Sequence, residues 1–121
     1  LIQNNITGID TQFPAPTLTN ISNNIITQNE KGIVVIDSFQ MTRNNIVNNF
    51  EYAILVKGHC PIVVQAVRQC HDINTSGNWW GSVDAGYIAR QIFDNEDLPQ
   101  VHRIVYIPYA TSEIPDAGPR L

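Results

Sequence analysis

The stretch GIVVIDSF, residues 32–39, decides our prediction of the fold. Four consecutive aliphatic residues lie between Gly32 and Asp37, with the β-branched Val34 and Val35 at their centre. A short apolar run without polar alternation is typical of a strand buried on both faces, as in a parallel sheet. We therefore predict a buried strand that ends at Asp37.

Two further apolar runs predict two more strands, YAILVKG at 52–58 and VHRIVYIPY at 101–109. The segments between and beside them show helical features. Pro61 suits the first turn of a helix, and Ser82 is a plausible N-cap. We expect helices at 61–70, from 82 to 92 or 93, and, as a short element, at 41–49.

Strands that alternate with helices predict an α/β domain. We expect one domain at 30–113, with a three- or four-stranded, mostly parallel sheet flanked by helices. Residues 1–29 are rich in Asn and Thr and are expected to form an irregular polar arm, and 114–121 an irregular tail. We identify no internal repeat.

Composition excludes several functions. The 121 residues carry a net charge of −4, and the seven Lys and Arg are scattered, so a nucleic-acid partner is not expected. No apolar run approaches the length of a membrane span. The chain lacks the Gly-rich motifs of nucleotide sites, and we expect no cofactor.

The two cysteines are Cys60 and Cys70. On one helix they would lie about 15 Å apart, so we predict that they do not pair. Free thiols favour a reducing compartment, whereas three Asn-X-Ser/Thr triplets, beginning at Asn5, Asn20 and Asn74, favour secretion. Both locations stay open.

Polar residues follow the predicted strands. In an open parallel sheet, the carboxyl ends of the strands lie along one edge, where ligands bind. That edge would carry Asp37, His59, Cys60 and the segment from Tyr109 to Ser112. Asp37 would orient His59 as a general base. The alternative is that Asp37 caps a turn and that His59 bonds to a local carbonyl.

Two motifs resemble those of the subtilisin-like serine peptidases. IVVIDS resembles the family's aspartate motif, and GHCPIVVQAV its histidine motif. The resemblance implies that Asp37 is the triad aspartate and His59 the base. Cys60 stands where the family has Gly, the spacing from Asp37 to His59 is short, and no Gly-Thr-Ser motif is present. The resemblance thus implies a catalytically incomplete relative.

An enzymatic alternative uses Cys60 or Ser112 as nucleophile with His59 and Asp37. A helix N-terminus and a nearby imidazolium would lower the pKa of the Cys60 thiol. The alternative is a half-buried cysteine without a chemical role. The spacing of His59-Cys60 and Cys70-His71 does not fit a zinc site, so we expect no metal.

The adjacent Trp79 and Trp80 lie in a loop with Gly and Ser, and aromatic residues in loops often form binding surfaces. Tyr109 and Thr111 would join them. We therefore expect a module that binds a protein or peptide, with the small hydrolase as one alternative. The other alternative is a structural accessory subunit of a larger assembly. The sequence does not specify the oligomeric state.

Overall fold

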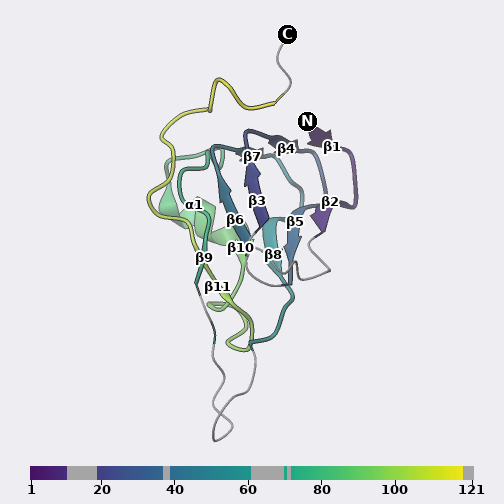
Figure 1. The fold of residues 1–121 in the computed structure, drawn as a ribbon, viewed down its shortest axis with the longest axis vertical. Coiled ribbons are helices and arrows are strands. Elements are labelled where there is room, and N and C mark those ends of the chain that lie inside the picture. The colour runs from purple at the N-terminus through teal and green to yellow at the C-terminus, as the bar shows by residue number, and fades with distance from the viewer. Residues whose placement is uncertain (11–18, 37–38, 61–69, 71, 119–121) are drawn as a thin grey trace, which may run out of the picture.

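A computed structural model describes residues 1–10, 19–36, 39–60, 70 and 72–118. It contains eleven described strands and one helix (Figure 1). The elements are β1 (Ile2–Gln3), β2 (Thr7–Asp10), β3 (Thr19–Ser22), β4 (Ile25–Thr27), β5 (Lys31–Val35), β6 (Phe39–Thr42), β7 (Asn45–Val47), β8 (Tyr52–Val56), β9 (Asp72–Asn74), α1 (Ala85–Arg90), β10 (Ile92–Phe93) and β11 (Arg103–Val105).

Every pair of described strands is parallel, and each strand pairs with one from the next turn of the chain. Sheet 1 has the order β1-β4-β7, and sheet 2 the order β10-β8-β5-β2. The third side is formed by the pairs β3-β6 and β11-β9. The described strands therefore wind as a parallel β-solenoid of four coils. The first coil contains β1, β2 and β3, the second β4, β5 and β6, the third β7, β8 and β9, and the fourth α1, β10 and β11.

The corners between the sheets repeat the same two-residue motif. A residue with positive φ is followed by an asparagine, as in Arg43 (φ 60°) before Asn44 and Asn48 (φ 55°) before Asn49. Gly77 takes the first position before Asn78, because glycine adopts positive φ without a steric penalty. The bend at each corner turns the chain from one sheet to the next.

The corner asparagines stack into two ladders. In one, the Asn24 N–H donates to Asn44 Oδ1 at 2.9 Å, and the Asn44 N–H donates to Asn78 Oδ1 at 3.0 Å. In the other, the Asn5 N–H donates to Asn29 Oδ1 at 3.0 Å, and the Asn29 N–H to Asn49 Oδ1 at 3.1 Å. These side chains satisfy buried backbone donors that the strands leave unpaired at the bends.

The hydrophobic core fills the interior of the coils. It is a stack of aliphatic residues closed by Trp80, which is 1% exposed. Its inward positions include Ile26, Ile33, Val35, Ile46, Ile54, Val56, Ile73, Trp80, Ile88 and Ile104. Because successive strands are in register, equal positions stack on one another, as Ile33 does on Ile54.

The fourth coil lies at the end of the described solenoid. Helix α1 directs Ile88, which is fully buried, into the core, and Asp84 caps the helix by accepting from the Gly86 N–H at 2.9 Å. The Asp94 carboxylate accepts from the Ile104 N–H at 2.7 Å, where a further strand would otherwise pair.

The predicted α/β fold is wrong. The described residues form small all-parallel sheets with one short helix, and no helical layer flanks them. The segment 1–29 is not an irregular arm, since it supplies β1, β2, β3 and β4. The repeat that the sequence analysis did not find links Asn29 to Asn49 and Asn24 to Asn44, each 20 residues apart.

Individual elements also differ from their predictions. The strand predicted at 52–58 is observed as β8. The strand predicted at 101–109 is observed only over the three residues of β11. The helix predicted at 41–49 is instead the end of β6, a corner and β7. The helix predicted from Ser82 is only α1, and its N-cap is Asp84. The predicted helix at 61–70 falls almost entirely outside the described residues.

Candidate functional site

A covering segment, residues 107–118, crosses the outer face of sheet 1. It leaves β11, passes α1 and runs above β7 and β4 (Figure 1). The Asn45 side chain fixes it with two hydrogen bonds: Nδ2 donates to the Ile114 oxygen at 3.0 Å, and Oδ1 accepts from the Ile114 N–H at 2.7 Å. The Gly118 N–H donates to the Asn23 oxygen at 2.8 Å. The segment thus lies along the sheet.

A pocket of about 260 Å³ lies between this covering segment and sheet 1. We call it the sheet 1 pocket, and its lining is Ile25, Asn45, Val47, Asn48, Trp79, Gly81 and Glu113. Trp79 is held beside β7, because its N–H donates to the Asn44 oxygen and its carbonyl accepts from the Ile46 N–H. The indole is partly exposed, so the pocket has one aromatic wall on a rigid sheet.

Three polar side chains of the sheet 1 pocket are unpaired. The Asn48 amide, the Glu113 carboxylate and the Trp79 indole N–H make no hydrogen bond or ion pair with the described residues. By contrast, both polar atoms of the Asn45 side chain are occupied by Ile114. The pocket therefore offers an amide, a charged acceptor and an indole donor around an aromatic surface.

The predicted binding residues lie in different places. Trp79 lines the sheet 1 pocket, whereas Trp80 is buried in the core and its indole N–H has no hydrogen-bond partner. Tyr109 lies in the covering segment, stacks on Tyr106 and donates its hydroxyl to the Val83 oxygen at 2.9 Å. Thr111 is exposed on the same segment.

Three of the predicted catalytic residues lie in described parts of the chain, with His59 and Cys60 together after β8 and Ser112 on the covering segment. Asp37 lies outside the described residues. His59 is exposed after β8 and forms a β-bridge with Val101. Ser112 is exposed on the covering segment, which packs on sheet 1 rather than on the sheet that contains β8.

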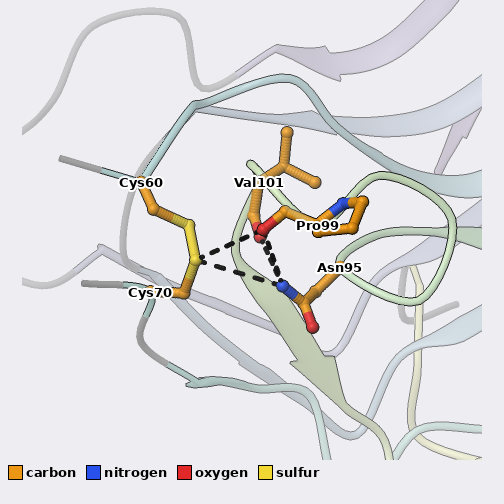
Figure 2. Close-up of a disulfide and its surroundings, with 5 residues drawn as sticks. All are labelled: Cys60, Cys70, Asn95, Pro99 and Val101. Atoms are coloured by element: carbon orange, nitrogen blue, oxygen red, sulfur yellow. Dashed lines mark hydrogen bonds between the residues drawn. A yellow bond between two sulfur atoms is a disulfide. The ribbon is translucent and has the colours of Figure 1, made fainter. Parts of the chain in front are cut away.

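Cys60 is bonded to Cys70, with their Cα atoms 4.8 Å apart (Figure 2). The prediction that the two cysteines do not pair is wrong. A sulfur in a disulfide is not a thiolate nucleophile, which removes Cys60 from the enzymatic alternative. The disulfide also removes the argument for a reducing compartment.

The disulfide lies against the loop between β10 and β11. The Cys70 Sγ is 3.7 Å from the Pro99 oxygen, and Asn95 Nδ2 donates to the Pro99 and Val101 oxygens at 3.1 and 3.2 Å (Figure 2). The Cys60 N–H donates to the Gln100 oxygen. The arrangement holds the loop in place and is structural.

Within the described ranges, no three His, Cys, Asp or Glu side chains are grouped as a metal site would require. No helix in the described part of the chain has the length and apolar character needed to cross a bilayer.

Sequence reasoning missed Asn45, Asn48 and Glu113 as residues of the pocket. The signal for the first two was the recurrence of asparagine at a spacing of 20 residues, Asn24 with Asn44 and Asn29 with Asn49, because Asn45 and Asn48 stand next to the second member of each pair. Glu113 had no signal, because it reaches the pocket only through the path of the covering segment.

The comparisons with known proteins give no relationship. No protein-family model, no curated protein sequence and no solved structure matches this chain.

Proposed function

We propose that this protein is a binding module that holds a neutral sugar residue in the sheet 1 pocket. The observation that carries the proposal is the half-exposed Trp79 indole beside the unpaired side chains of Asn48 and Glu113. A sugar ring has an apolar C–H face that packs on an aromatic ring, and a rim of hydroxyl groups that need polar partners.

The charge of the sheet 1 pocket limits the class of sugar that it can bind. Glu113 is its only charged residue, and a carboxylate accepts strong hydrogen bonds from hydroxyl groups. It would repel a uronic acid, so a neutral sugar is favoured over an acidic one. A pocket of about 260 Å³ is slightly smaller than the sites that enclose drug-sized molecules, which suits one ring of a longer glycan.

The test is calorimetric titration with cellobiose, lactose and chitobiose in its N,N′-diacetylated form as neutral probes and glucuronic acid as the charged one. We expect at least one neutral disaccharide to bind, Trp79→Ala to abolish binding, and Glu113→Gln to weaken it. Phe50→Ala is the matched control, because Phe50 is an aromatic residue that is 76% exposed outside the pocket. Binding that survives Trp79→Ala, or a chain that binds peptides but none of these sugars, contradicts the proposal.

A further inference from the structure

A second, larger cavity of about 500 Å³ lies at the fourth coil. Residues from the end of α1, from the loop after β10, from β11 and from the start of the covering segment line it. We call it the end cavity. It shares no lining residue with the sheet 1 pocket, so the two sites can be tested separately.

Two guanidinium groups in the end cavity are not neutralised. Arg90 comes from the last turn of α1 and Arg103 from β11, and both are exposed. Neither forms an ion pair with a described carboxylate, whereas Arg43 lies 3.6 Å from Asp116 and Lys31 is paired with two glutamates. A guanidinium offers a planar set of donors that matches a carboxylate.

Two of the three acidic residues that line the end cavity, Asp94 and Asp97, are engaged by the loop. Asp94 accepts from the Glu96 N–H with one oxygen and from the Ile104 N–H with the other. Burial raises the pKa of the Asp94 carboxyl above its ordinary value. Asp97 accepts from the Asp94 N–H at 3.1 Å. The Asp94 and Asp97 carboxylates therefore hold the loop rather than the arginines, whereas the Glu96 carboxylate forms no hydrogen bond or ion pair with the described residues and leaves one negative charge beside the two guanidinium groups.

The remaining wall is apolar and firmly placed. The Tyr106 ring stacks on Tyr109 with a centroid distance of 6.3 Å and an interplanar angle of 27°. Tyr109 is itself anchored by its hydrogen bond to the Val83 oxygen. Ile107 lines the same wall and is 61% exposed, so it presents apolar surface that a ligand can cover.

We propose that the end cavity binds an organic anion, a carboxylate attached to an aromatic or apolar body. Arg90 and Arg103 would take the carboxylate, and Tyr106 and Ile107 the body. Tyr109 is a positioning residue, because it does not line the cavity and supports Tyr106 through the stacked rings. The cavity has a cationic side and an apolar side. An inorganic anion would use only the cationic side, so an organic anion fits the lining better.

The experiment titrates the full chain with benzoate, benzamide and benzylamine, which share a ring and differ in charge. We expect benzoate to shift the amide resonances of the end cavity, with benzamide weaker and benzylamine inactive, and added salt to weaken the benzoate effect. Arg90→Gln and Arg103→Gln should each weaken benzoate binding about tenfold, and Tyr109→Phe by less.

Arg43→Gln is the control, since Arg43 lies at a corner outside the cavity. Unfolding curves of all variants check that they fold. Benzylamine binding as tightly as benzoate, or unchanged benzoate affinity in both cavity arginine variants, would overturn the proposal. Sulfate alone binding as tightly as benzoate would do the same. None of these results depends on sugar binding at Trp79.

Discussion

Asn45 and Ile114 exchange two hydrogen bonds across 69 positions of sequence, one donated and one accepted by the Asn45 side chain. The amide thereby imitates the backbone of a neighbouring strand. It joins the third coil to a segment that has no regular secondary structure. These two bonds fix the covering segment at the residue next to Glu113, which lines the sheet 1 pocket.

Asn45→Ala is expected to free the covering segment. Losing both bonds costs about 1–3 kcal/mol in the local opening equilibrium, so amide exchange around Ile114 should rise about tenfold or more. Sugar affinity should fall with it, because Glu113 is no longer fixed. Arg43→Ala is the control: its ion pair with Asp116 is exposed, so exchange should hardly change. Equal exchange in Asn45→Ala and in the wild type would contradict this role.

The asparagine ladders are expected to stabilise the whole solenoid. Asn44 is fully buried, accepts from Asn24 and donates to the Ile21 and Thr42 oxygens. Asn44→Ala leaves several buried groups unpaired and should lower the free energy of unfolding by about 2–4 kcal/mol in urea denaturation. Asn20→Ala, at an exposed strand position, should stay within about 0.5 kcal/mol of the wild type. A similar loss of unfolding free energy in both variants would contradict a stabilising role of the asparagine ladder.

The positive φ of the corner residues predicts stability changes of opposite sign for substitutions at two corners. Gly77→Ala puts a Cβ at φ +80°, 2.6 Å from the Thr42 Oγ1, and should destabilise by about 1–2 kcal/mol. Gln28 is exposed with φ 56°, and Gln28→Asn should stabilise by a few tenths of a kcal/mol, because Asn tolerates this region better. Denaturant midpoints of the two variants on the same side of the wild type would refute the corner model.

Asp94 is expected to make stability depend on pH. Its folded pKa is raised by burial, so in the window from 3.8 upward the folded chain holds more protons than the unfolded chain. Its contribution is therefore present below 3.8 and is lost as pH rises through the folded pKa. Asp94→Asn should remove this part of the slope in unfolding free energy measured against pH, and Asp10→Asn, at an exposed position, should keep it. An unchanged slope in Asp94→Asn would contradict the assignment.

The disulfide is expected to contribute stability and no chemistry. It closes a short loop, since its cysteines are ten positions apart, so replacing both by Ser should lower the free energy of unfolding by about 2–3 kcal/mol. Adding a reductant to the wild type should produce the same shift. A thiol-directed probe that labels the native, unreduced protein would argue against this assignment.

The apolar run at 32–36 was interpreted correctly as a buried parallel strand, and the inference failed at the next step. Val34 is buried although it lies outside the core cluster, so β5 has the two-sided burial that its sequence indicates. Two-sided burial does not specify helices as the cover. The Asn-rich corners of Asn44 and Asn49 resembled loop or weak helix, because their role depends on hydrogen bonds to other coils.

The candidate site was predictable only in part. Trp79 and Trp80 are adjacent but lie in different surroundings: Trp79 forms a bridge to Asn45 and lines the pocket, whereas Trp80 joins the core. The partners of Trp79 come from different coils and from the covering segment. No spacing in the sequence brings Asn48 and Glu113 together.

The central claim is most directly tested by the two indole N–H resonances, one from each tryptophan, in the nuclear magnetic resonance spectrum of the folded chain. Trp79→Phe assigns them by removing one. On addition of cellobiose, lactose or chitobiose at millimolar concentration, the account predicts that at least one sugar shifts the Trp79 resonance while that of the buried Trp80 stays in place. If no sugar moves the Trp79 resonance, or if only the Trp80 resonance moves, the sheet 1 pocket is not a sugar site.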